Sequence, residues 1–350
     1  MGFDNLDRIP IAYATPSLGM HPSHTLELKL EAASKAGFQG VEIGFDDLVS
    51  HADRHNPGFK GEEDIPTLLK SASEIRDLCS KLNLKVICLQ PFQDFEGATE
   101  TKDREARFTR AEKYLAIMKE LGTTMLQVGS TDNPATSGDK ELIASDLADL
   151  CDFAASQDPP CKIAYEPWCW GAHINTWESG WEIIQLTKRN NIGINLDTFQ
   201  VPGREWADPA SETGLIEGYS ERELSAKFEA SMQALAETIP GDKIYYVQIS
   251  DGLKMDPPIR EGGHNAYEKG KPARGQWSHA YRPLPYEDGY LPWMTALKGF
   301  LKTGFSGWCS MEIFEERQMN EDENIPKEYA EKGMEAWKKI LQDLKKEGNT

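Results

Sequence analysis

The sequence predicts an α/β fold, a single (β/α)8 barrel that spans residues 1–350, and three observations lead to it. The chain has 350 residues, and barrels of about 250 residues or more are routinely one folding unit. Eight short apolar runs occur along it, with amphipathic stretches between them. Strands that alternate with helices in this way form a parallel sheet. An open doubly wound sheet is the alternative, but eight similar units favour closure, and no GxGxxG follows the first run.

Each of the eight runs is mostly apolar, as expected for parallel strands that are covered on both faces. In chain order they are IAYATPS (11–17), GVEIGF (40–45), KVICLQP (85–91), TMLQVGS (124–130), KIAYEPW (162–168), GINLDTF (193–199), IYYVQIS (244–250) and WCSMEIF (308–314). Helix-like segments lie between them at 24–36, 64–82, 104–121, 140–156 and 176–190, and each ends near a Gly or Asn.

Two segments break this alternation. Residues 252–281 are rich in Gly, Pro, Lys and Arg, and residues 201–218 form a shorter irregular stretch. Both follow predicted strands, so we expect them at the face of the barrel where active sites form. A long loop at that face is a lid, a specificity element or a loose insertion, and the sequence leaves these readings open.

Composition and charge limit the possible partners. Hydrophobic residues make up 39% of the chain, and the formal net charge is −19. That charge would repel phosphate backbones, and no concentrated basic face offsets it, so we expect a small-molecule substrate and no nucleic acid. Much of the charge falls on helix faces such as 326–346, so it identifies no site by itself.

The chain is also expected to work away from membranes. No stretch approaches the roughly 18 apolar residues of a membrane span, and the start, MGFDNLDRIP, lacks the features of a signal peptide. The six cysteines include no CxxC pair and lie mostly in apolar runs, which favours reduced thiols. We therefore expect a cytoplasmic protein.

The most informative feature is a polar residue at the end of each of the last four runs. These residues are Glu166 in AYEP, Asp197 in NLDTF, Gln248 in YVQIS and Glu312 in SMEIF. Buried carboxylates repel one another unless a cation neutralises them, and no Lys or Arg lies within these strand ends. We expect the four to bind one divalent cation. An all-oxygen donor set favours Mg²⁺ or Mn²⁺, with Co²⁺ and Zn²⁺ left open.

These four residues and the words around them resemble the xylose-isomerase-like TIM-barrel superfamily. Further words resemble the 3-dehydroshikimate dehydratase family within it, of the fungal, single-domain type. They are LQPFQDFEG (89–97), YEPWCWGAHINTW (165–177), LDTFQ (196–200), VQISDG (247–252) and SHAYRPLP (278–285). The chain departs from relatives at two positions: Gln200 stands where many members have His, and Gln93 stands where bacterial dehydratases have Arg. A base or a carboxylate anchor at those positions cannot be carried over.

The resemblance implies a lyase that dehydrates 3-dehydroshikimate to protocatechuate in quinate and shikimate catabolism. The C4 proton of that substrate lies α to a ketone and the C5 hydroxyl lies β to it, so water leaves by an enolate-type elimination that a cation assists. A sugar isomerase or epimerase on the same metal-binding barrel is the alternative. A barrel endonuclease would need a His-rich multi-zinc site and a basic face, and the sequence shows neither. A non-catalytic binding barrel would leave the four expected ligands without a function.

The candidates for proton transfer are His173 and His279, which follow barrel strands, with His51 and His55 as weaker candidates. Each of these histidines could instead be an ordinary hydrogen-bonding residue. Asp251 could orient a base or a metal-bound water, or cap a turn.

The candidate substrate-binding residues lie at strand ends and in the loops that follow them. Arg282, in the R-x-x-P word, suits a substrate carboxylate or hydroxyl, and Trp170 could wall off a dry pocket. The others are Glu42, Gln90, Gln93, Gln200 and Arg107. For Arg107 and its neighbour Arg110, a solvated helix face is the favoured interpretation and a substrate anchor is the alternative. The sequence leaves open the physiological metal, the base, the oligomeric state and whether 252–281 closes as a lid.

Overall fold

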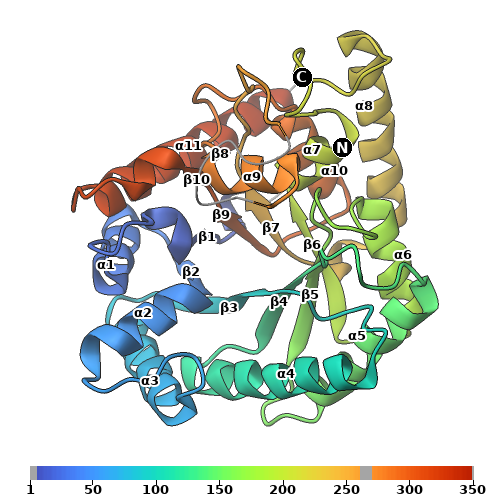
Figure 1. Ribbon diagram of the computed structural model, residues 1–350. Coiled ribbons are helices and arrows are strands. Elements are labelled where there is room, and N and C mark those ends of the chain that lie inside the picture. The colour runs from blue at the N-terminus through green and yellow to red at the C-terminus, as the bar shows by residue number, and fades with distance from the viewer. Residues whose placement is uncertain (1–5, 261–269, 349–350) are drawn as a thin grey trace.

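The computed structural model of the protein describes residues 6–260 and 270–348 and has a closed parallel barrel at its centre (Figure 1). The barrel strands are β1 (Ile11–Ala14), β2 (Gly40–Gly44), β3 (Lys85–Phe92), β4 (Met125–Gly129), β5 (Lys162–Glu166), β6 (Ile192–Asp197), β7 (Ile244–Ile249) and β9 (Trp308–Met311). They pair in chain order, and β9 closes the barrel by pairing in parallel with β1. The predicted fold class is therefore confirmed, and each of the eight runs overlaps one barrel strand.

Helices surround the barrel (Figure 1). Five match the predicted segments: α1 (Leu26–Ala36), α3 (Ile65–Lys81), α4 (Thr101–Leu121), α5 (Lys140–Ala155) and α6 (Trp177–Thr187). The others are α2 (Phe45–His55), α7 (Gln200–Glu205), α8 (Glu221–Thr238), α9 (Ala273–Ala280), α10 (Trp293–Lys302) and α11 (Ile325–Gly348). Short 3-10 turns lie at Leu6–Arg8, Thr15–Leu18, Gly241–Lys243 and Glu316–Met319.

Local sequence signals set the ends of several helices. The Thr25 side chain accepts from the backbone N–H of Leu28 at the start of α1, and Thr176 and Ser220 form capping boxes at the starts of α6 and α8. The helix α1 ends at Ala36, and Gly37 caps it with a φ of 99°, which is strained for residues with a side chain. The charged tail helix α11 is amphipathic: it packs against α1 and buries Tyr329, Trp337 and Ile340.

The two irregular segments acquire structure at the barrel mouth. Residues 201–218 begin with most of α7, and Ala207 pairs with Leu215 in an isolated bridge. Residues 252–281 contain α9, and the middle part of the expected lid, 261–269, lies outside the described residues. The chain then enters β8 (Tyr281–Arg282), which pairs antiparallel with β10 (Phe314–Glu315). This pairing holds the end of the loop against the segment that follows β9.

The inside of the barrel is layered, because side chains that face the interior recur at every second residue of each strand. One layer, from alternate strands, consists of Ala12, Cys88, Ala164 and Tyr246. The next, from the other four strands, consists of Glu42, Gln127, Asn195 and Ser310. Two residues beyond the first layer, the same strands carry Gln90, Glu166 and Gln248, and the mouth carries Asp197 and Glu312. The interior is thus polar from its second layer up to the mouth, and all these side chains are buried.

Among residues 6–260 and 270–348, none of the helices combines the length and the apolar character that crossing a bilayer requires.

Candidate metal centre and active site

Three of the four expected metal ligands converge at the barrel mouth. Glu166 ends β5, Asp197 ends β6 and Glu312 directly follows β9. One carboxylate oxygen from each lies within 4.8 Å of the others, and all three residues are buried. A cation placed among these oxygens would find three negative ligands from three strands, so the cluster can hold a divalent metal.

The electrostatics of this cluster favour the binding of a cation. Burial raises the pKa of Glu166, and repulsion from Glu312 and Asp197 raises it further. Burial also raises the pKa of Glu312 to about 6, although Arg282 opposes the rise. The Oε1 atom of Glu166 is buried and has no hydrogen-bond partner among the described residues. A buried acceptor without a donor is costly, and a metal ion would satisfy it.

A basic side chain reaches the cluster from outside the barrel strands. Arg282, in β8, donates to Asp197 and lies 2.9 Å from Glu312 Oε2 through Nη1. Its Nε donates to Ser250 Oγ at 2.6 Å, and the guanidinium lies over the Phe199 ring. Arg282 therefore pairs with the expected metal ligands, whereas the sequence suggested substrate binding. It supplies one positive charge against three carboxylates.

Gln248, the fourth expected ligand, lies beside the carboxylates but is engaged elsewhere. It is the register partner of Asp197 on the neighbouring strand. Its Nε2 donates to Glu42 Oε2 at 3.0 Å, and its Oε1 accepts from Asn195 Nδ2 at 2.7 Å. To ligate a metal, its amide oxygen would have to exchange the Asn195 contact for the cation.

Glu42 and Gln90 extend the buried network. Glu42 accepts from Gln248, and burial together with repulsion from Glu312 raises its pKa to about 8. The thiol of Cys88 donates to Glu42 Oε2 at 3.6 Å. Gln90 donates from Nε2 to Glu312 Oε1 at 3.0 Å. Both residues were expected to bind substrate, and the structure places both in direct contact with residues of the expected metal quartet.

The two candidate bases occupy different surroundings. The Nε2 atom of His173 lies 2.8 Å from the carbonyl oxygen of Thr136, in the loop after β4. His279 is on α9, with Nδ1 2.6 Å from the Gly275 carbonyl oxygen and its ring edge-on to Trp170 at 5.5 Å. Burial lowers the pKa of His279 to about 4, so its imidazole is neutral near pH 7.

The Asp251 carboxylate accepts hydrogen bonds from backbone N–H groups. Its Oδ1 accepts from the N–H groups of Gly252 at 2.7 Å and Leu291 at 2.9 Å. Burial raises the pKa of this carboxyl to about 7. These contacts correspond to the turn-capping alternative, since they join the start of the loop after β7 to the segment before α10.

Two stacked indoles lie beside Glu166. Trp168 and Trp170 are buried, with ring centroids 4.9 Å apart. A Cβ at Gly129, the last residue of β4, would lie 2.0 Å from Trp168, so only glycine leaves room for that indole. Gln200 accepts from the backbone N–H of Cys169, between the two tryptophans, at 3.0 Å. The indoles and Gln200 thus form one packed wall.

The loop after β3 is held by the two arginines that follow it. Arg107 donates to the carbonyl oxygens of Phe95 and Glu96, and Arg110 donates to those of Gln93 and Asp94. The Gln93 side chain is exposed. Arg107 therefore stabilises the backbone of the loop after β3 in this structure.

Sequence reasoning missed two interior amides. Gln127 donates to Glu166, and Asn195 donates to Gln248. The signal was present, because each lies at an alternate position of an apolar strand, where a polar side chain is buried inside the barrel.

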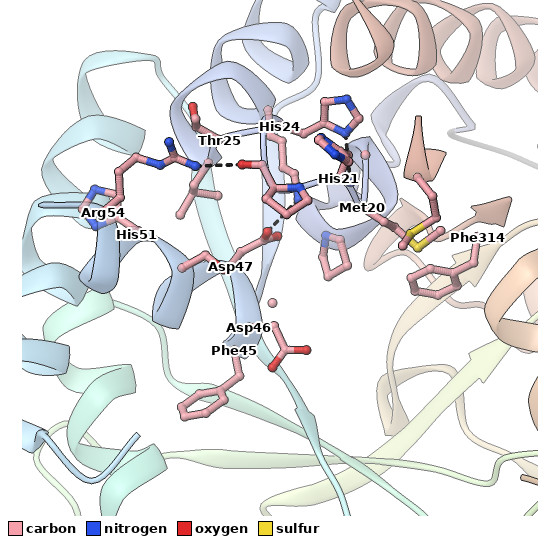
Figure 2. A pocket seen from close by; sticks show the side chains of 18 of the residues that line it. Met20, His21, His24, Thr25, Phe45, Asp46, Asp47, His51, Arg54 and Phe314 are labelled. Carbon is pink, nitrogen blue, oxygen red and sulfur yellow. Dashed lines mark hydrogen bonds and ion pairs between the residues drawn. The ribbon is translucent and has the colours of Figure 1, made fainter. Parts of the chain in front are cut away.

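A pocket of about 740 Å³ lies between α2, the segment before α1 and the region of α9 and β10 (Figure 2). Pro91, His279 and Phe314 line its side toward the barrel mouth. Its other walls come from the segment before α1 and from α2, and include His21, His24, Asp46, Asp47 and His51. The three carboxylates of the cluster are not among its lining residues.

A closed parallel barrel with an oxygen-rich ligand cluster at the carboxyl ends of its strands defines the class of protein. The chain belongs to the xylose isomerase-like TIM barrel family, whose model matches residues 30–340. Within this family it is similar to the 3-dehydroshikimate dehydratase of Neurospora crassa, at 33% identity over 345 residues that cover 96% of this chain and 94% of that one. A dehydratase removes water, so this relative is by name a hydro-lyase.

A bacterial dehydratase and a solved structure are also similar. The 3-dehydroshikimate dehydratase of Pseudomonas aeruginosa is 30% identical over 297 residues, which cover 83% of this chain but 36% of that protein. The structure of a xylose isomerase-like TIM barrel/4-hydroxyphenylpyruvate dioxygenase fusion protein is 26% identical and superposes with a TM-score of 0.71. The match covers 96% of this chain and 43% of the fusion protein. This chain therefore corresponds to less than half of each of these longer proteins.

Proposed function

We propose that this protein is a metal-dependent hydro-lyase that converts 3-dehydroshikimate to protocatechuate and water. The observation that carries the proposal is the convergence of Glu166, Asp197 and Glu312 in a barrel that is similar over nearly its whole length to a dehydratase with this substrate in its name. The elimination places negative charge on a ketone oxygen, and a cation held by these carboxylates is the partner that such a charge requires.

The proposed metal is Mg²⁺ or Mn²⁺, because the available donors are oxygens. Glu166, Asp197 and Glu312 would hold it, with Gln248 as the fourth ligand once its amide oxygen turns from Asn195. The buried, unpartnered Oε1 of Glu166 supports this fit. When bound, such an ion polarises a carbonyl as a Lewis acid and stabilises negative charge that develops on its oxygen.

His279 is our candidate for the base. Its neutral imidazole would take the C4 proton of the substrate, the double bond would form between C4 and C5, and the C5–O bond would break. The imidazolium would return that proton to the departing hydroxyl, so that water leaves with no net change in the protein. Loss of a C6 proton and protonation of the C3 oxygen then make the ring aromatic.

The stacked indoles of Trp168 and Trp170 would exclude water from this step, and Trp170 also contacts His279. Gln200 fixes the backbone between them. The sequence resemblance leads one to expect His and Arg at positions 200 and 93, where this chain has glutamines, so we assign proton transfer to a different element, α9.

A direct assay tests the proposal. Protein treated with a chelator and then supplied separately with Mg²⁺, Mn²⁺, Co²⁺ or Zn²⁺ is incubated with 3-dehydroshikimate, and protocatechuate is followed by its absorbance. We expect product only in the presence of metal. No catechol product with any of the four ions would overturn the assignment.

A sugar isomerase or epimerase is the second candidate. It is favoured by the presence of two glutamates, Glu166 and Glu312, in one ligand cluster, since two carboxylates at a metal can move a proton between carbons. Turnover of a ketohexose together with no turnover of 3-dehydroshikimate would favour this candidate.

We infer that the reaction serves quinate and shikimate breakdown in the cytoplasm, with a small molecule as the ligand. Size-exclusion chromatography with light scattering would measure whether the chain forms a homo-oligomer.

A further inference from the structure

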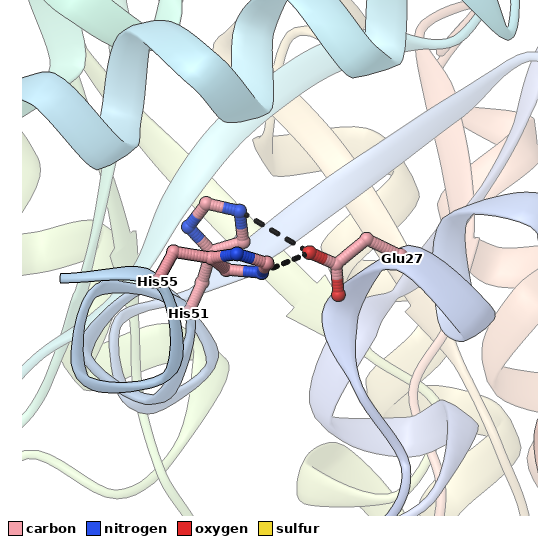
Figure 3. Close-up of side chains that lie close together, drawn as sticks. All are labelled: Glu27, His51 and His55. Carbon is pink, nitrogen blue, oxygen red and sulfur yellow. Dashed lines mark hydrogen bonds and ion pairs between the residues drawn. The ribbon is translucent and has the colours of Figure 1, made fainter. Parts of the chain in front are cut away.

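A second group of metal-binding side chains lies outside the barrel, where α1 meets α2 (Figure 3). Glu27 is in the first turn of α1, and His51 and His55 lie four residues apart on α2. Side chains four apart share one face of a helix, and Figure 3 shows both imidazoles directed at the Glu27 carboxylate. One ligand atom from each of the three residues lies within 4.8 Å of the others.

The spacing of these atoms fits a metal ion. The Glu27 Oε1 atom lies 3.3 Å from Nε2 of His51 and 2.7 Å from Nε2 of His55. Ligand atoms about 2.0–2.1 Å from a tetrahedral zinc ion lie roughly 3.3 Å apart. The two imidazoles are side by side, with ring centroids 4.5 Å apart. Small adjustments would therefore place three ligands around one ion.

The present hydrogen bonds satisfy this cluster incompletely. A single carboxylate oxygen serves both imidazoles. The His51 side chain is only 7% exposed, so the Nε2 atom that faces Glu27 is largely shielded from solvent. Hydrogen bonding to His51 lowers the pKa of Glu27, so the carboxylate is ionised at neutral pH. One anionic oxygen and two imidazole nitrogens are the donors that zinc and its neighbours prefer.

The basic side chains near this cluster, Lys29 and Arg54, pair with other groups. Lys29 pairs with Asp47 at 2.6 Å, and Arg54 donates to the Pro22 carbonyl oxygen at 2.7 Å, as Figure 2 shows for Arg54. Glu27 and His51 also line the pocket described above, which leaves space beside the ligands for a water molecule as the fourth ligand.

We propose that Glu27, His51 and His55 form a second metal site, which takes Zn²⁺ or a similar transition-metal ion through one carboxylate oxygen and two imidazole nitrogens and ties α2 to α1. The site is separate from the barrel carboxylates in position and in donor type. Its three side chains include nitrogen donors, whereas the barrel cluster offers oxygen. Zinc bound here would cross-link two helices that both border the pocket.

The test is zinc stoichiometry in the full chain, measured by equilibrium dialysis on wild type and on His55→Ala. His55 is 45% exposed on its side chain, so its removal is expected to leave the fold intact. We expect wild type to bind one more zinc ion per chain than His55→Ala, whatever number the barrel binds. His21→Ala, which changes another histidine of the pocket, is the matched control and should keep the wild-type number. Equal stoichiometry in wild type and His55→Ala would overturn the proposal.

Two further measurements distinguish a metal site from a simple hydrogen-bonded cluster. Zinc should shift the Nε2 resonances of two histidines in nitrogen NMR spectra, and neither shift should occur in Glu27→Gln/His55→Ala. Glu166→Gln should still bind the ion that depends on His55, because that ion does not use the barrel ligands. If Glu166→Gln removes the ion that depends on His55, the two sites are not separate and the proposal fails.

Discussion

Arg282 and Asp197 form a fully buried ion pair at the barrel mouth, although 85 residues separate them in the sequence. The same guanidinium also reaches Glu312. Burial favours the neutral form of both carboxylates, and the arginine opposes that tendency. Arg282 thus favours the ionised form of Asp197 and Glu312, which is the form that can bind a metal.

Replacing this arginine should destabilise the protein. Arg282→Met leaves buried carboxylates without their cation, and breaking a buried ion pair from one side typically costs about 3–5 kcal/mol. We expect a lower free energy of unfolding in chelator and partial recovery in Mg²⁺, measured by urea denaturation. Arg189→Met, which removes an exposed pair with Asp152, should change stability by about 1 kcal/mol or less. Equal losses in the two variants would contradict this prediction.

Neutralising Glu166 should have opposite effects on the stability of the metal-free protein and on the stability gained from metal. Glu166→Gln removes one charge from a cluster that has three carboxylates and one arginine. In chelator we expect the variant to be as stable as wild type or more stable, because repulsion from Asp197 and Glu312 is relieved. In Mg²⁺ wild type should gain about 2.7 kcal/mol at a metal concentration 100 times its Kd, whereas the variant should gain little. Thermal denaturation with and without metal measures both effects, and an equal gain in the variant would exclude Glu166 as a ligand.

His279 and His173 should differ in their effect on catalysis. His279→Gln should lower kcat by about 10²- to 10⁴-fold, which is the usual contribution of a general base. His173→Gln is the matched control, because its imidazole contacts the Thr136 carbonyl oxygen, and it should keep most of kcat. The opposite ranking would transfer the role to His173.

The pH profile offers an independent check on His279. A base accepts a proton only in its neutral form, so its activity is present above its pKa and is lost as the pH falls through that value. With the pKa of His279 lowered to about 4, the acid limb that it causes should lie near pH 4. No loss of kcat/KM from this residue should occur between pH 6 and 8. A limb near pH 6.5, the ordinary value for histidine, would argue against the buried placement.

Gly129→Ala should damage the wall beside Glu166. The added methyl group would lie 2.0 Å from Trp168, so the indole must move or the strand must shift. Overpacking of this kind costs about 1–3 kcal/mol, and we expect kcat to fall as the wall opens. The double variant Gly129→Ala/Trp168→Phe should recover part of the stability because the smaller ring leaves room. Additive losses in calorimetry would show that the two positions do not interact.

The strands and the carboxylates were predictable from sequence because both depend on local patterns. Apolar runs of this length predict buried parallel strands, and a polar residue at the carboxyl end of such a run lies at the barrel mouth. Glu166, Asp197 and Glu312 follow from that geometry alone. The alternation of side chains could have been used further, since it also predicts the buried amides of Gln127 and Asn195.

The rest depended on contacts between distant segments. Arg282 reaches Asp197 only because β8 pairs with β10 and turns the loop end over the mouth, and no local pattern encodes that pairing. The polar stretch that contains His51 and His55 forms α2, and its histidines meet Glu27 from a different helix. The amide of Gln248 illustrates the same difficulty, because its neighbours Asn195 and Glu42 come from two other strands.

The polar interior of the barrel has a consequence for how this chain can change over time. Most apolar burial lies outside the barrel, between strands and helices, while the apolar cluster inside the barrel is small and includes Ala12, Ala164 and Tyr246. Substitutions among the interior amides and carboxylates therefore remove little of the apolar packing on which folding depends. Substitutions at the mouth can change the metal ligands and the substrate-binding residues while the packing between strands and helices stays the same. The inside of this barrel can therefore acquire a different reaction without loss of the fold.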